Sequence, residues 1–208
     1  MIGEVIRKYK ISNNKIIIGG MSVAGTGSIR YAEYCYLNKS SYGIKPCGVF
    51  GVDPPLDYER LYNESYKAII RNFSKDAVDE GKILIELLTR NLKGTPQTNI
   101  KSYQTTSPFC YSASNGGNAY LLNHLAVRLY TEPDINWWID NRRKDYYDLN
   151  SIDDAALINQ LKLYGNLNAE LIVSHNKELK IEGHPHSWSM VNEQELLLWC
   201  NKRFSESK

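Results

Sequence analysis

The sequence predicts an α/β fold, with a parallel sheet of four strands and helices on both of its faces. Two observations predict it. Short runs of apolar, mostly β-branched residues show no alternation with polar ones, as is typical of strands buried on both faces of a parallel sheet. Segments with helical spacing separate these runs, so the strands are joined by right-handed crossovers. The expected strands are 15–20, 46–52, 126–131 and 169–173.

The first half of the chain contains two predicted helices and two predicted strands. Apolar residues at helical spacing begin the chain, and Ser12-Asn-Asn14 ends this helix. The run Lys15–Gly20 follows as the first strand, and a small-residue turn leads into a second helix with Ile29, Ala32 and Tyr36 on one face. The second strand, 46–52, ends at Asp53-Pro-Pro.

The second half begins with a long helical stretch and returns to strands. Residues 57–125 lack a strong strand signal, and we expect them to form a helical insertion after the second strand. Between the third and fourth strands, Ser151 and Asp154 resemble a capping box before a helix that ends near Gly165. Asn192 and Glu195 form a second such pattern at the start of the last helix.

Composition limits the function classes. The chain has 208 residues, of which 42% are hydrophobic and 23% charged, as in ordinary globular proteins. Lysine and arginine number 25 against 23 acidic residues, and no basic run concentrates the formal charge of +2. The longest apolar runs are too short to span a bilayer. We therefore expect a single domain, 1–208, that binds neither nucleic acid nor membrane.

The cysteines and the N-terminus predict a cytoplasmic protein without metal or cofactor. Cys35, Cys47, Cys110 and Cys200 lie far apart and form no CxxC pair. This spacing is typical of buried free thiols in a reducing compartment rather than of a zinc or redox site. The N-terminal residues lack the apolar stretch and the cleavage site of a signal peptide.

The turn after the first strand carries the strongest chemical signal. Gly20-Met-Ser22-Val-Ala24 fits G-x-S-x-G with alanine in the last place. In such an elbow a nucleophilic serine occupies a strained turn, and the flanking residues must be small so that strand and helix pack closely. Ser22 is the candidate nucleophile, and the amide of Val23 would face the developing oxyanion. The alternatives are an ordinary βα turn and a phosphate loop, although neither GxGxxG nor a Walker pattern fits.

A serine nucleophile needs a base, and the chain has four histidines. His184 and His186 lie in the loop between the last strand and the last helix, where catalytic groups gather in such folds. We expect His124 and His175 to be structural. His184 and His186 could instead bind a metal ion, but no compact set of acidic or cysteine ligands accompanies them.

The acid that orients the imidazole is expected to follow a strand. Asp134 and Glu132 follow the third strand, and Asp53 follows the second. For the aspartates a helix cap or a turn is the competing interpretation. Serine, acid and histidine then occur in the chain order of α/β-hydrolases.

The sequence resembles α/β-hydrolases of the bacterial serine-esterase type. The resemblance is carried by the segments 17–27, 51–57, 128–138 and 184–189. By position, it implies Ser22 as nucleophile, Asp134 as acid and His186 as base, with His184 as the alternative base. It also implies a lid at 57–125 and a small ester-like substrate, with no cofactor.

The resemblance covers only the carboxyl-terminal portion of that family, so we expect an N-terminally truncated form of the fold. The family's sheet has eight strands, and its front half supplies the second oxyanion amide. Without that front half, the strand Lys15–Ile18 would be an exposed apolar edge of the sheet, which favours self-association. The sequence thus predicts a serine hydrolase, with a non-catalytic remnant or binding module and a metal hydrolase as alternatives.

Overall fold

The computed structural model describes residues 2–37, 39–40, 43–175 and 183–207. Its helices and strands alternate as an α/β fold requires. In chain order they are α1 (Ile2–Tyr9), β1 (Ile17–Met21), α2 (Val23–Tyr36), β2 (Gly48–Val52), α3 (Tyr58–Arg71), α4 (Lys75–Leu92), α5 (Pro96–Thr106), η1 (Ser114–Leu122), β3 (Ala126–Thr131), α6 (Ile135–Arg142), η2 (Tyr146–Asp148), α7 (Asn150–Leu163), β4 (Ala169–Val173), η3 (Trp188–Met190) and α8 (Glu193–Glu206). The elements η1, η2 and η3 are 3₁₀ helices.

The strands form one parallel sheet in the order β1-β2-β3-β4, which confirms the prediction of four parallel strands. Gly20 of β1 lies opposite Gly51 of β2, and Leu129 of β3 lies opposite Leu171 of β4. Because all the strand pairs are parallel, the carboxyl ends of the strands lie at the same edge of the sheet. The turns after β1 and β2 therefore lie side by side.

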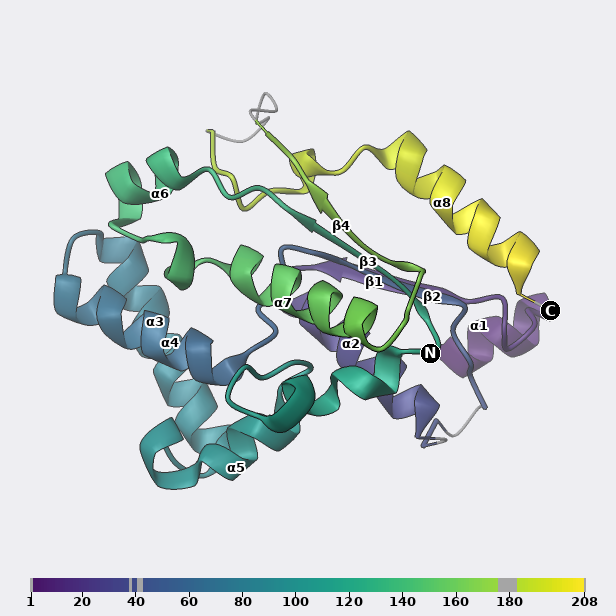
Figure 1. The fold of residues 1–208 in the computed structure, drawn as a ribbon, viewed down its shortest axis with the longest axis horizontal. Coiled ribbons are helices and arrows are strands. Elements are labelled where there is room, and N and C mark those ends of the chain that lie inside the picture. The colour runs from purple at the N-terminus through teal and green to yellow at the C-terminus, as the bar shows by residue number, and fades with distance from the viewer. Residues whose placement is uncertain (1, 38, 41–42, 176–182, 208) are drawn as a thin grey trace.

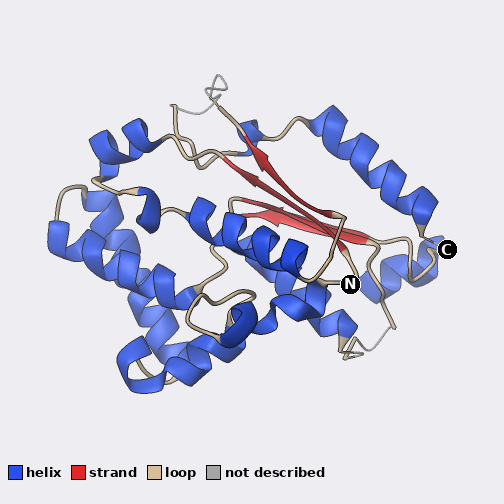
Figure 2. Ribbon diagram, viewed as in Figure 1, coloured by secondary structure: helices blue, strands red, loops and turns tan. Residues whose placement is uncertain are grey.

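Helices cover both faces of the sheet, as predicted. α2 and α7 pack on one face and α8 on the other, with the strands between them (Figures 1 and 2). Ile29 of α2 and Leu157 of α7 share a buried cluster with Val127 of β3. On the opposite face, Trp199 of α8 packs with Tyr130 of β3. The fold class is thus α/β with a layered core.

Two local predictions are wrong. β1 is only partly buried and Gly19 is exposed, although its apolar run predicted burial on both faces. β1 lies at the edge of the described sheet, which confirms the expected edge strand, whereas β3 is buried along its whole length. The second error is the start of α7, which begins at Asn150 without a side-chain cap, so the Ser151 capping box does not form.

Residues between β2 and β3 are helical, as expected for 57–125. α3, α4 and α5 lie to one side of the sheet (Figure 1). η1 instead packs against α2 and α7, with Ala119 and Leu122 in the core. Asp57 caps α3 and Ser74 caps α4 through side-chain hydrogen bonds to backbone amides. α3 and α4 approach closely at Gly81, where a Cβ would lie 2.8 Å from the Ser65 carbonyl oxygen. None of the helices described is both long enough and apolar enough to cross a bilayer.

Candidate active site

Ser22 lies in a strained turn between β1 and α2. Its backbone has φ 54° and ψ −129°, a left-handed conformation that non-glycine residues seldom adopt. The Ser22 N–H donates to the Val52 carbonyl of β2 at 2.8 Å, and the Thr26 N–H donates to the Ser22 carbonyl at 3.0 Å. These bonds tie the turn to both the sheet and the helix. The serine is thus held at the carboxyl edge of the sheet, as the motif predicts.

Small residues beside Ser22 allow strand and helix to approach. A Cβ on Gly20 would lie 2.7 Å from the backbone carbon of Ala24, and one on Gly25 would lie 2.8 Å from the Gly20 carbonyl oxygen. Both distances are shorter than real Cβ atoms keep from neighbouring backbone atoms, so only glycine fits at these two positions. The spacing of small residues therefore has a steric cause in this fold.

Replacing Gly20 with valine is expected to lower the free energy of unfolding by roughly 3 kcal/mol or more, because the new side chain meets backbone that cannot move aside. Urea denaturation measures the change. Gly27 of α2 is the matched control, because a Cβ there meets nothing within 4 Å. Gly27→Ala should stabilise the protein by about 0.5–1 kcal/mol. A Gly20→Val protein as stable as wild type would contradict the close approach at the elbow.

The amide of Val23 is a candidate oxyanion donor. Val23 is the first residue of α2, where backbone N–H groups have no acceptor within the helix. The helix dipole places partial positive charge at the same end. A negative charge that develops beside Ser22 would therefore be stabilised from this side.

His186 reaches the carboxyl edge of the sheet from the loop before η3 and pairs with Asp53. His186 Nδ1 lies 2.5 Å from Asp53 Oδ2. Asp53 Oδ1 accepts a hydrogen bond from Thr131 Oγ1 at 3.1 Å, so both carboxylate oxygens have partners. Burial opposes a charged His186, but the hydrogen bond and charge of Asp53 outweigh it, and the pKa of His186 lies above its usual value.

The predicted pairing of Asp134 with His186 is therefore wrong. Asp134 is the N-cap of α6, and its Oδ1 accepts a hydrogen bond from the Trp137 N–H at 3.1 Å. Glu132 is buried directly after β3, but His186 Nδ1 has its contact with Asp53. Asp53 is one of the alternatives that the sequence leaves open for the acid, with a turn residue as the competing interpretation. The adjacency of β2 to β1 places Asp53 beside the elbow, and the loop before η3 brings His186 to it.

A buried polar network holds the Asp53 loop in place. Asn150 Nδ2 donates to the Asp53 carbonyl at 3.0 Å, and Arg60 donates to Asn150 Oδ1 at 2.8 Å and to Asp153 Oδ1 at 2.6 Å. Asp153 in turn accepts from the backbone amides of Leu56 and Asp57. No short-range pattern in the sequence signals the positioning roles of Arg60 and Asn150. Their partners are about 90 residues away in the chain.

His184, the alternative base, instead holds the backbone of His186. Its Nδ1 accepts a hydrogen bond from the His186 N–H at 3.1 Å, and its ring packs against Trp137 with centroids 4.2 Å apart. Burial and then the charges of His186, Arg142 and Lys144 lower its pKa to about 4. A neutral His184 that holds the backbone of the next turn is consistent with these contacts. The geometry favours His186 as the base.

The other histidines lie away from Ser22. His124 stacks on Tyr36 with centroids 4.3 Å apart, and burial lowers its pKa. His175 follows β4 and lines a separate cavity with Asp134. Neither is among the residues that surround Ser22.

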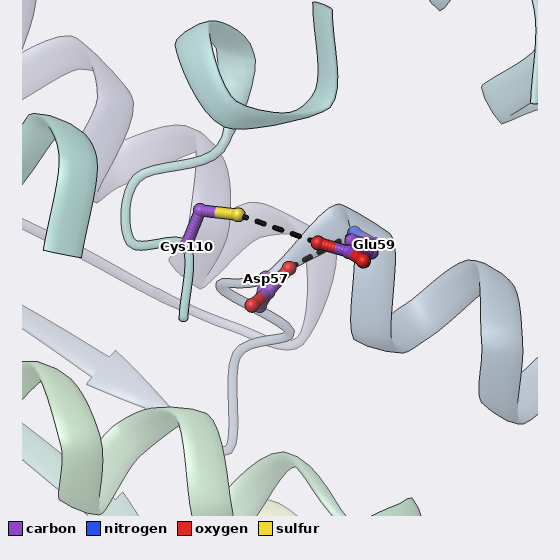
Figure 3. Close-up of side chains that lie close together, drawn as sticks. All are labelled: Asp57, Glu59 and Cys110. Atoms are coloured by element: carbon purple, nitrogen blue, oxygen red, sulfur yellow. Dashed lines mark hydrogen bonds between the residues drawn. The ribbon is translucent and has the colours of Figure 1, made fainter. Parts of the chain in front are cut away.

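Among the residues described, Asp57, Glu59 and Cys110 form the one group with three potential metal ligands close together (Figure 3). Each offers a ligand atom within 4.8 Å of the others. However, Asp57 accepts hydrogen bonds from the amides of Glu59, Arg60 and Tyr111. Burial and the nearby carboxylates raise the pKa of Cys110 to about 11. This arrangement fits the N-cap of α3, and His184 and His186 are not part of it.

Ser22 and His186 line the same cavity, which has a volume of about 170 Å³. Within the described part of the chain, no hydrogen bond joins their side chains, and catalytic contacts are often long in an unliganded protein. α3 and α4 form the opposite wall with Leu61, Leu84 and Glu80. Trp138 and Lys144 contribute from α6 and the segment after it. The helical insertion thus contributes part of the wall of the cavity that Ser22 lines.

Comparisons with protein-family models, with curated proteins and with solved structures find no match for this chain. The site combines a strained serine at a helix N-terminus with a histidine that pairs with an aspartate at the end of the neighbouring strand. Ser22 and His186 line one cavity.

Proposed function

We propose that this protein is a serine hydrolase of the α/β-hydrolase type that acts on small ester-like substrates. Ser22 is its nucleophile, His186 its base and Asp53 its acid. The observation that carries the proposal is the His186–Asp53 pair at the cavity that contains the strained Ser22. Serine, acid and histidine also keep the chain order of that family, with the acid one strand earlier than the resemblance implies.

The reaction follows from these positions. His186 Nε2 accepts the proton of Ser22 Oγ as that oxygen attacks the ester carbonyl carbon, and the Val23 amide stabilises the resulting oxyanion. The protonated histidine then gives its proton to the departing alcohol, which leaves an acyl-serine. Water attacks this acyl group while His186 takes the water's proton. The proton returns to Ser22 as the carboxylic acid is released.

The helices α3 and α4 serve as a lid in this proposal. They cover the cavity, and its volume of about 170 Å³ is little larger than a cavity that holds benzene, about 150 Å³. The substrate is accordingly small. A substrate bound in this partly apolar cavity would displace water, which strengthens each electrostatic interaction inside it.

Covalent labelling tests the proposal. A fluorophosphonate probe should react with the purified protein at one site, because Ser22 Oγ attacks phosphorus and fluoride leaves. Intact mass should rise by one adduct, and peptide mapping should place it on Ser22. Heat-unfolded protein is the control and should not react. Folded protein that resists the probe would favour the non-catalytic alternative, a hydrolase framework that binds ligands without turnover.

A further inference from the structure

A second cavity, with a volume of about 660 Å³, is much larger than the cavity at Ser22. Different faces of α3 line the two cavities. Leu61 and Ser65 belong to the wall of the Ser22 cavity, and Asn63 and Lys67 belong to the wall of the second one. Sites for small molecules typically measure about 300–1,000 Å³. The second cavity therefore has the size of a ligand site, and no step of the proposed hydrolysis uses it.

Three tyrosine rings line this second cavity, and they come from three different segments. Tyr66 belongs to α3, Tyr111 to the segment before η1, and Tyr147 to η2. Their exposed fractions are 55%, 72% and 71%, so most of each ring is uncovered. The Tyr111 ring packs edge-on against Phe109, with centroids 5.7 Å apart, which holds it in place. Exposed aromatic rings that gather around one cavity are typical of a surface that a ligand covers.

The charged side chains of the second cavity are already paired within the protein. These pairs are Arg60 with Asp153, Lys67 with Asp148, Glu64 with Lys144, and Asp57 with three backbone amides. Asp148 and Asp153 are each only 2% exposed. A charged ligand would compete for the partners of these buried carboxylates, and breaking a buried ion pair is strongly unfavourable. The ligand that fits this lining is therefore neutral.

We propose that the second cavity binds a neutral saccharide. The C–H face of a sugar ring covers a tyrosine ring, while its hydroxyl groups form hydrogen bonds with the tyrosine hydroxyls, the Asn63 amide and the ion pairs. A purely apolar ligand would bury the same polar groups without hydrogen bonds, which costs binding free energy. A saccharide matches both the aromatic and the polar parts of the lining. This inference goes beyond the hydrolase function and does not depend on it.

Calorimetric titration and saturation-transfer NMR test the proposal. The probes are three neutral disaccharides that differ in linkage or in sugar: maltose, cellobiose and lactose. At least one of them should bind with a Kd of about 1 mM or lower. Indole, which has an aromatic ring but no sugar hydroxyls, and glucuronate, which is anionic, should bind more weakly than that disaccharide. Absence of binding by all three disaccharides, or stronger binding of indole or glucuronate, would overturn the proposal.

Tyrosine variants locate the binding. Tyr111→Ala and Tyr147→Ala should each weaken binding of that disaccharide about tenfold, because each removes one ring contact. Tyr120→Ala is the matched control, because Tyr120 is 54% exposed on η1 and does not line the cavity. Substitution of such exposed side chains changes stability little, and circular dichroism checks that each variant is folded. Affinity that survives both cavity variants would overturn the assignment of the site.

The Ser22→Ala protein separates this inference from the hydrolase proposal. It lacks the nucleophile and should bind the disaccharide as wild type does, because Ser22 lines only the smaller of the two cavities. Saccharide binding by a protein that resists the fluorophosphonate probe would support this inference and contradict the hydrolase proposal. Labelling of Ser22 in a protein that binds none of the disaccharides would do the reverse.

Discussion

Ser22→Ala is expected to lower the rate of ester hydrolysis about 10⁶-fold, the loss seen when the nucleophile of a serine–histidine–acid triad is removed. Without Oγ no acyl-enzyme forms, and only substrate binding and the Val23 amide remain to assist water. The substitution should change the free energy of unfolding by less than about 0.5 kcal/mol. Within the described part of the chain the hydroxyl makes no hydrogen bond, and alanine needs no more space than serine.

Steady-state kinetics and urea denaturation measure these two effects. Ser28→Ala is the matched control, because Ser28 lies on the same helix and its Oγ donates only to the Ala24 carbonyl within that helix. Its activity should stay close to that of wild type. Hydrolysis that survives Ser22→Ala would remove Ser22 from the mechanism.

Asp53→Asn is expected to lower turnover about 10⁴-fold, because an amide at this position no longer holds the imidazole in its active tautomer. Asparagine tolerates the left-handed backbone of Asp53, which has φ 47°, and can still accept from Thr131. The folded structure should therefore persist. Asp134→Asn is the matched control, because asparagine caps a helix as well as aspartate does. Activity lost in Asp134→Asn and kept in Asp53→Asn would contradict the assignment of the acid.

The pH profile of the same variants provides a second measurement. Catalysis needs neutral His186, so kcat/KM falls as the pH drops through the pKa of this residue. Because Asp53 helps to raise that pKa above the usual value for histidine, the acid limb in wild type should lie correspondingly high. Asp53→Asn removes the negative charge and should move the limb to lower pH. An unshifted limb would mean that another group controls it.

The fold was largely predictable because its signals are local. The bounds of β3 and β4 match the predicted segments 126–131 and 169–173, since short apolar runs bounded by polar turns mark strands. The Asn192 cap of α8 also forms as its spacing predicts. Ser22 was identified in the same way, because the steric demands of its turn involve residues within three positions of it.

The acid and the surroundings of the site depend on contacts between distant parts of the chain. Asp53 and His186 are 133 positions apart, and Asp53 became the partner because β2 lies next to β1, with its end beside the elbow. Asp134 has a local use as the cap of α6, which a sequence pattern cannot distinguish from a catalytic one. Local sterics and periodicity thus determined the strands, the helices and the position of the serine. Only the packing of the sheet and its loops decided which carboxylate meets the histidine, because this depends on distances that no short stretch of sequence specifies.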